Sequence, residues 1–105
     1  MSGDKEILQE IKAAIIREIP DAKIFLFGSR VNGIVHEESD WDILILTKKK
    51  YSKEMRWKIQ DNLFPLSIKL FAFMDVKLVQ EEEWNHNPGY YSLKLDISKH
   101  KTLAL

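Results

Sequence analysis

Residues 28–47 read GSRVNGIVHEESDWDILILT and hold the strongest pattern in the chain. Asp40 and Asp42 open an apolar run that is predicted to be a strand. Side chains two residues apart in a strand share a face, so these two carboxylates lie about 7 Å apart along the backbone. Because like charges so close repel unless a cation lies between them, the pair predicts a metal site.

The expected metal is Mg²⁺, which takes carboxylate oxygens and also binds substrate phosphates. Two such ions, about 3.5–4 Å apart, would activate an attacking oxygen and stabilise the leaving one. Mn²⁺ is the alternative metal.

The turn before this strand is predicted to bind phosphate. Gly28 lets the backbone approach an anion closely, and Ser29 adds a hydroxyl donor. A short helix over residues 29–32 would add backbone amides. Arg30 would neutralise phosphate charge with its guanidinium, although a plain surface cation is nearly as good an interpretation of this residue.

Asp75 is the natural candidate for a third carboxylate. It interrupts an apolar stretch and is followed by the run Val76–Val79. A strand of these residues beside residues 41–47 would bring Asp75 near Asp40 and Asp42. The alternative is an exposed acid on an edge strand.

Hydrophobic periodicity predicts an α/β (α+β) arrangement. The expected helices cover residues 4–19, residues 52–64 and a segment that starts at residues 87–88; the expected strands cover residues 23–27, residues 41–47 and a bent or interrupted region over 68–79. Pro65 is expected to end the second helix. Residues 102–105 are expected to add an edge strand or a contact surface.

The bulk composition narrows the class of protein. With 105 residues, the chain is expected to be one domain, residues 1–105. The 16 basic and 16 acidic residues cancel, which argues against nucleic acid as a partner. Without cysteine, a disulfide or thiolate metal site is excluded. No run approaches the roughly 18 apolar residues of a membrane span, and the start lacks an apolar signal core. A cytoplasmic protein without membrane association is therefore expected.

The spacing Gly28-Ser29, ten residues, Asp40-Trp41-Asp42 resembles the signature of the DNA polymerase beta-like nucleotidyltransferases. In particular it resembles the minimal nucleotidyltransferases, or MNT proteins, and the resemblance covers most of the chain. It implies the nucleotidyltransferase fold, a mixed sheet of three to four strands flanked by helices. It also implies Mg²⁺-dependent transfer of a nucleoside monophosphate from a nucleoside triphosphate, with AMP from ATP expected.

The resemblance also implies roles for single residues. Gly28 and Ser29 would hold the triphosphate, and Asp40 and Asp42 would bind metal. Asp75 would be the third acid, which assists metal binding and deprotonates the acceptor hydroxyl. Many MNT proteins pair with a HEPN-domain protein as antitoxin and toxin, and some add AMP to a tyrosine of that partner. A HEPN protein is therefore the expected partner and acceptor.

Two other functions stay open. The first is an antitoxin or interaction module that neutralises a HEPN toxin by binding, with weak or absent catalysis. The second is a nucleotidyltransferase for an aminoglycoside-like small molecule, which would need an acceptor-binding domain or a dimer. Apolar Leu103 and Leu105 at the end of the sequence leave a homo-oligomer open as well.

Overall fold

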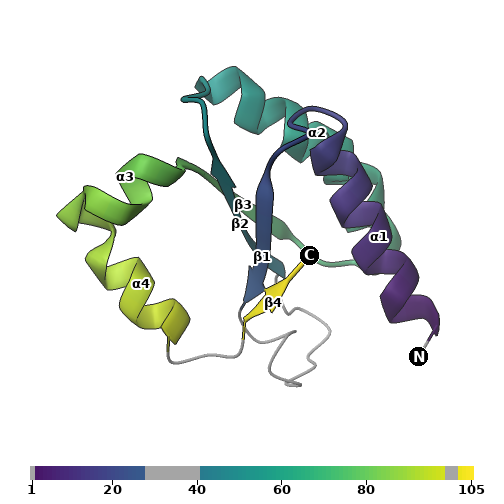
Figure 1. Ribbon diagram of the computed structural model, residues 1–105. Helices are drawn as coiled ribbons and strands as arrows, with labels where there is room; N and C mark the ends of the chain where they lie inside the picture. Colours follow the sequence, from purple (N-terminus) through teal and green to yellow (C-terminus); the bar gives the residue numbers. More distant parts are fainter. Residues whose placement is uncertain (1, 28–40, 99–101) are drawn as a thin grey trace.

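The computed structural model describes residues 2–27, 41–98 and 102–105. Its elements are, in order, α1 (Ser2–Ile16), β1 (Lys23–Phe27), β2 (Trp41–Thr47), α2 (Lys53–Leu70), β3 (Met74–Gln80), α3 (Glu81–His86), the 3₁₀ helix η1 (Pro88–Tyr90), α4 (Tyr91–Ser98) and β4 (Leu103–Ala104). The strands form one sheet in the order β3-β2-β1-β4. β1 is antiparallel to β2 and β4, whereas β2 and β3 are parallel. The predicted mixed sheet with flanking helices is confirmed (Figure 1).

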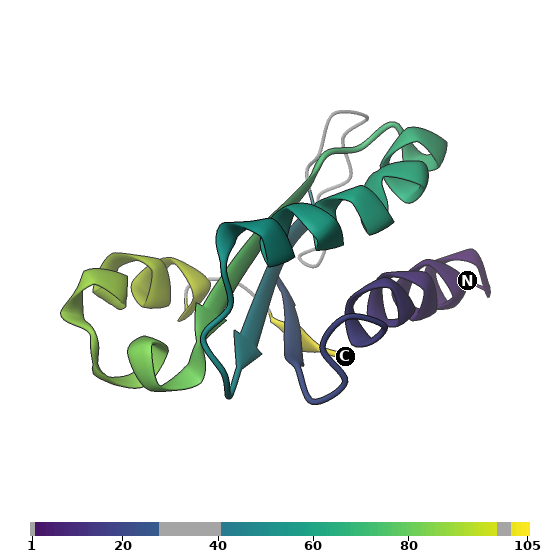
Figure 2. The same cartoon turned by 90° about the horizontal axis from the view of Figure 1, so that it is seen from above.

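Side-chain alternation gives the sheet two apolar faces. One face packs against α1 and α2, and the other against α3, η1 and α4, so the sheet lies between two helical layers (Figure 2). The core on the α1–α2 side includes Ile11, Ile15, Ile24, Leu26, Ile43, Ile45, Ile59, Leu63, Met74 and Val76. The smaller core on the other side is built from Phe27, Leu44, Leu46 and Val79. Each fully buried aliphatic side chain stabilises the fold by about 1.5–3 kcal/mol.

A polar contact fastens α2 to the end of α1. The Asn62 side chain donates to the carbonyl of Ala14 at 3.1 Å and to Glu18 Oε2 at 2.8 Å. Lys58 Nζ lies 3.2 Å from Glu18 Oε1. The hydrogen bond from Asn62, helped by Lys58, holds the pKa of Glu18 below its ordinary value.

The predicted end of the second helix at Pro65 is wrong. α2 continues to Leu70 with Pro65 inside it. Proline removes one helical hydrogen bond. Leu63 and Leu66 on either side of it are buried in the core, and this packing compensates for the lost bond, so the helix continues. The helix ends at Phe71, whose φ of 51° is left-handed. The third strand therefore begins at Met74, and the predicted strand region over 68–79 was too long.

The other elements lie close to prediction. The first helix ends at Ile16 and not at Ile19. The helix start predicted at residues 87–88 is confirmed, because the Asn87 side chain accepts from the Gly89 N–H at 2.8 Å before α4 begins. β4 pairs with β1 as the predicted edge strand. No helix in the described part of the chain is long and apolar enough to cross a bilayer.

Candidate functional site

Two acids predicted for the site, Asp42 and Asp75, are direct neighbours in the sheet. Each is the second residue of its strand, β2 or β3. The strands run parallel, and Asp42 is the register partner of Asp75. Register partners share a face of the sheet, and neighbouring strands are about 4.8 Å apart. Residues far apart in the sequence thus place two carboxylates side by side.

The acids point to the side of the sheet that is away from α1 and α2. Ile43 and Val76, which alternate with them, are buried in the α1–α2 core. Leu44 follows Asp42 on the acids' own face and packs toward α3 and α4. Asp42 and Leu44 thus share the face of the sheet that lies toward α3 and α4.

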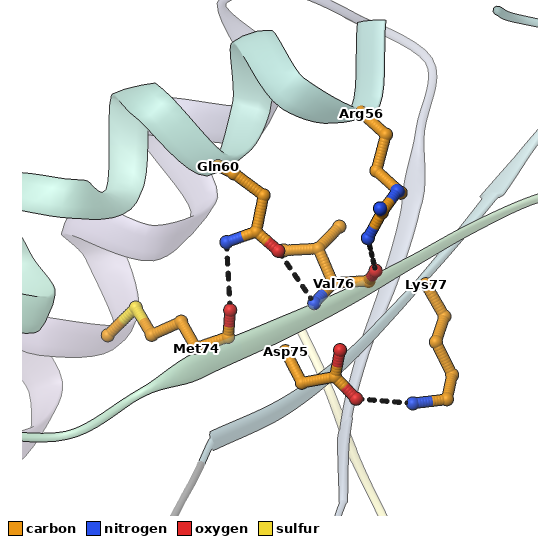
Figure 3. A network of polar contacts seen from close by, with 6 residues as sticks. All are labelled: Arg56, Gln60, Met74, Asp75, Val76 and Lys77. Atoms are coloured by element: carbon orange, nitrogen blue, oxygen red, sulfur yellow. Dashed lines mark hydrogen bonds and ion pairs between the residues drawn. The ribbon is translucent and has the colours of Figure 1, made fainter. Parts of the chain in front are cut away.

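Asp75 is half-exposed and paired with a cation on its own strand. The ammonium Nζ of Lys77 lies 2.5 Å from Asp75 Oδ2, and both side chains keep about a third of their surface exposed, 34% for the lysine and 37% for the acid. Figure 3 shows the two side chains meeting on one side of β3. This basic neighbour was missed by the sequence analysis, although its spacing of two from Asp75 in a strand was a usable signal.

The backbone on both sides of Asp75 is held by α2. The Gln60 amide donates to the Met74 carbonyl at 2.9 Å and accepts from the Val76 N–H at 3.3 Å. Arg56 Nη1 donates to the Val76 carbonyl at 3.4 Å. β3 is an edge strand, so these α2 side chains take the place of a further strand along it (Figure 3). Sequence analysis missed both residues; their spacing of four on one helix face was the available signal.

The remaining predicted site residues, Gly28, Ser29, Arg30 and Asp40, lie outside the described residues. Among the described residues, no three His, Cys, Asp or Glu side chains form a metal-binding group. Asp42 and Asp75 provide two adjacent carboxylates, and hard oxygen ligands of this kind fit Mg²⁺ or Mn²⁺. The donor set of the described residues thus suits the expected metal.

The chain is similar to a known protein family and to solved structures. The sequence profile of the family described as "Polymerase beta, Nucleotidyltransferase" matches residues 9–98. No curated protein matches the sequence. A crystal structure of a toxin–antitoxin MntA-HpeT mutant is similar at a TM-score of 0.59 and 23% identity, over 90% of this chain and 69% of that chain. A putative nucleotidyltransferase is similar at a TM-score of 0.51 and 24% identity, over 93% of this chain and 96% of that chain.

Proposed function

Because the chain belongs to the polymerase beta nucleotidyltransferase family, we propose that it transfers AMP from ATP to an acceptor hydroxyl. The observation that carries this proposal is the register pairing of Asp42 with Asp75 on one face of the sheet. Two adjacent carboxylates favour a bound cation, which suits the metal-dependent chemistry of this family. The family match spans residues 9–98, which supports one nucleotidyltransferase domain over residues 1–105.

We assign the roles by the chemistry of each side chain. Asp42 and Asp75, with Asp40, would hold two Mg²⁺ ions, which supply charge neutralisation for the triphosphate when bound. Asp75 accepts the proton of the acceptor hydroxyl. The acceptor oxygen then bonds to the α-phosphorus, and the bond from that phosphorus to the bridging oxygen breaks, so pyrophosphate leaves. Gly28, Ser29 and Arg30 are assigned to the triphosphate by their residue types and position in the motif.

The acceptor we propose is a tyrosine of a HEPN-type toxin partner, which makes this chain an antitoxin. Support comes from the likeness to the toxin–antitoxin MntA-HpeT structure. The mutant in that structure carries two Asp-to-Glu substitutions two positions apart, the spacing of Asp40 and Asp42 here. The likeness to the putative nucleotidyltransferase supports the same reaction class.

Label transfer tests the reaction. The tagged chain, purified from its source cells with any bound protein, is incubated with Mg²⁺ and ATP labelled at the α-phosphate. Label is expected on the bound protein, and Asp42→Asn is expected to abolish the transfer. Asp61→Asn is the matched control, because Asp61 is an exposed acid on α2. Label transfer that persists in Asp42→Asn, or is absent from the wild type, would overturn the proposed reaction.

A second experiment separates catalysis from neutralisation by binding. Cells that express the co-purified protein are supplied in trans with the wild-type chain, with Asp42→Asn or with Asp75→Asn. The growth of the three cultures is then compared. Loss of rescue in both variants supports an antitoxin that acts by transfer. Equal rescue by wild type and variants identifies the binding module instead. Transfer of label to an aminoglycoside and not to a protein would identify the small-molecule enzyme.

A further inference from the structure

Lys77, the cation beside Asp75, is one of few basic residues on the described strands. Of the described strand residues, two are basic, Lys23 and Lys77. Lys23 Nζ is bound to Glu81 Oε1 at 2.9 Å, at the opposite end of β1 from Phe27, the residue that pairs with Asp42. Lys77 is therefore the strand cation placed at the acid pair.

The rows of the sheet fix the position of Lys77. Asp42 and Asp75 form one row on this face, and Leu44 and Lys77 form the next. Phe25 completes the second row by pairing with Leu44. The lysine stem thus stands beside apolar side chains, while its ammonium extends to the neighbouring row and reaches Asp75. This arrangement lets the stem pack and keeps the charge at the edge of the carboxylates.

A lysine in this position is suited to two successive contacts. Its ammonium is a compact charge on a flexible four-carbon stem, with three donors that rotate freely. Beside two adjacent carboxylates without metal, it offsets their repulsion. Once a divalent cation binds the carboxylates, it repels the ammonium of Lys77. The ammonium is then attracted to the phosphate oxygens of the nucleotide. The partial exposure of its side chain leaves room for that movement.

We propose that Lys77 is the resident counter-ion of Asp75 in the metal-free protein and a triphosphate-binding residue in the loaded one. This inference rests on the proposed function, because it needs a metal and a nucleotide at Asp42 and Asp75. It predicts opposite effects of Lys77 on the two ligands. The lysine competes with the metal for Asp75, and it attracts the nucleotide.

Two binding measurements on the full chain test the proposal without turnover. Mn²⁺ affinity is measured without nucleotide, by the loss of the free-ion electron paramagnetic resonance signal. Affinity for the non-transferable α,β-methylene ATP is measured at saturating Mn²⁺ by calorimetry. Lys77→Met keeps the length of the stem and removes the charge. We expect it to bind Mn²⁺ about two- to fivefold more tightly, the range of a partly exposed ion pair. We expect it to bind the nucleotide about tenfold more weakly, because a charge-assisted contact is lost.

The controls separate this inference from the proposed function. Lys69→Met removes the same charge from α2 and is expected to change neither affinity; Lys77→Gln provides a second neutral variant. Asp75→Asn is expected to weaken Mn²⁺ binding. If Asp75→Asn weakens it while Lys77→Met and Lys77→Gln match the wild type for either ligand, the Lys77 inference falls and the site stands. If the wild type binds neither Mn²⁺ nor the nucleotide analogue, both fall.

Discussion

Asp42 and Asp75 are register partners on neighbouring parallel strands, and the helix that joins the two strands packs on the opposite face of the sheet. This connection leaves the carboxylates on the face that α1 and α2 do not cover. The cost of the arrangement is electrostatic, because two like charges about one strand spacing apart repel. A cation bound between them would attract both carboxylates. The free energy of unfolding should therefore rise when the cation binds.

Mg²⁺ is therefore expected to stabilise the fold. At a free concentration about a hundred times Kd, binding to the folded form alone adds about 2.7 kcal/mol to the free energy of unfolding. For a domain of this size that raises Tm by roughly 10 °C or more. The rise should be lost in Asp42→Asn and kept in Asp61→Asn. Thermal scans with Mg²⁺ and with chelator measure it, and an equal rise in all three proteins would place the ion elsewhere.

Removing the Gln60 amide is expected to weaken both the fold and the site. Gln60→Leu leaves the Met74 carbonyl and the Val76 N–H without the hydrogen bonds that the amide provides. The loss in the free energy of unfolding should be about 1–2 kcal/mol, measured in urea. Mn²⁺ affinity should fall as well, because the backbone that carries Asp75 is no longer held.

Gln60→Glu separates the two hydrogen bonds. Its carboxylate still accepts from the Val76 N–H, but an acceptor oxygen then faces the Met74 carbonyl in place of the amide donor, so it should lose about as much stability as Gln60→Leu. Gln9→Leu, at an exposed position on α1, should leave both stability and Mn²⁺ affinity unchanged. Full Mn²⁺ affinity in Gln60→Leu would show that α2 does not position Asp75.

The parts of the fold that the sequence predicted well are those set by local pattern. The strand at residues 41–47 and the helix start at Asn87 follow from a short apolar run and from a capping residue before proline, signals that act within a few residues. Pro65 misled because burial of Leu63 and Leu66 is a tertiary effect that overrides local preference. Gln60 could not be assigned a role, because its contacts depend on which face of α2 meets the edge of β3. Lys77 lies two residues from Asp75 on the same strand, so its pairing was within reach of the strand pattern.

Two isoleucines test the assigned faces of the core. Ile45 on β2 is 0% exposed in the α1–α2 core, whereas Ile68 on α2 is 59% exposed. Ile45→Ala should lower the free energy of unfolding by about 3–4 kcal/mol, the transfer and cavity terms together. Ile68→Ala should change it by about 0.5 kcal/mol or less. Chemical denaturation gives both values, and similar losses in the two variants would mean that the register of β2 is misassigned.

The contact between Asn62 and Glu18 should make stability depend on pH in the acid range. The hydrogen bond from Asn62 favours the charged carboxylate, so the folded pKa of Glu18 lies below its ordinary value of 4.5. The stabilisation is complete above that ordinary value and is lost as the pH falls through the lower, folded pKa.

Glu18→Gln should therefore be less stable than the wild type near neutral pH, and the gap should narrow as the pH falls below 4.5. Asn62→Leu should flatten the same dependence, because the first cause of the shift is removed. Urea denaturation of the three proteins across this range measures the gap, and a gap that stays constant with pH would contradict the role of the Asn62 hydrogen bond.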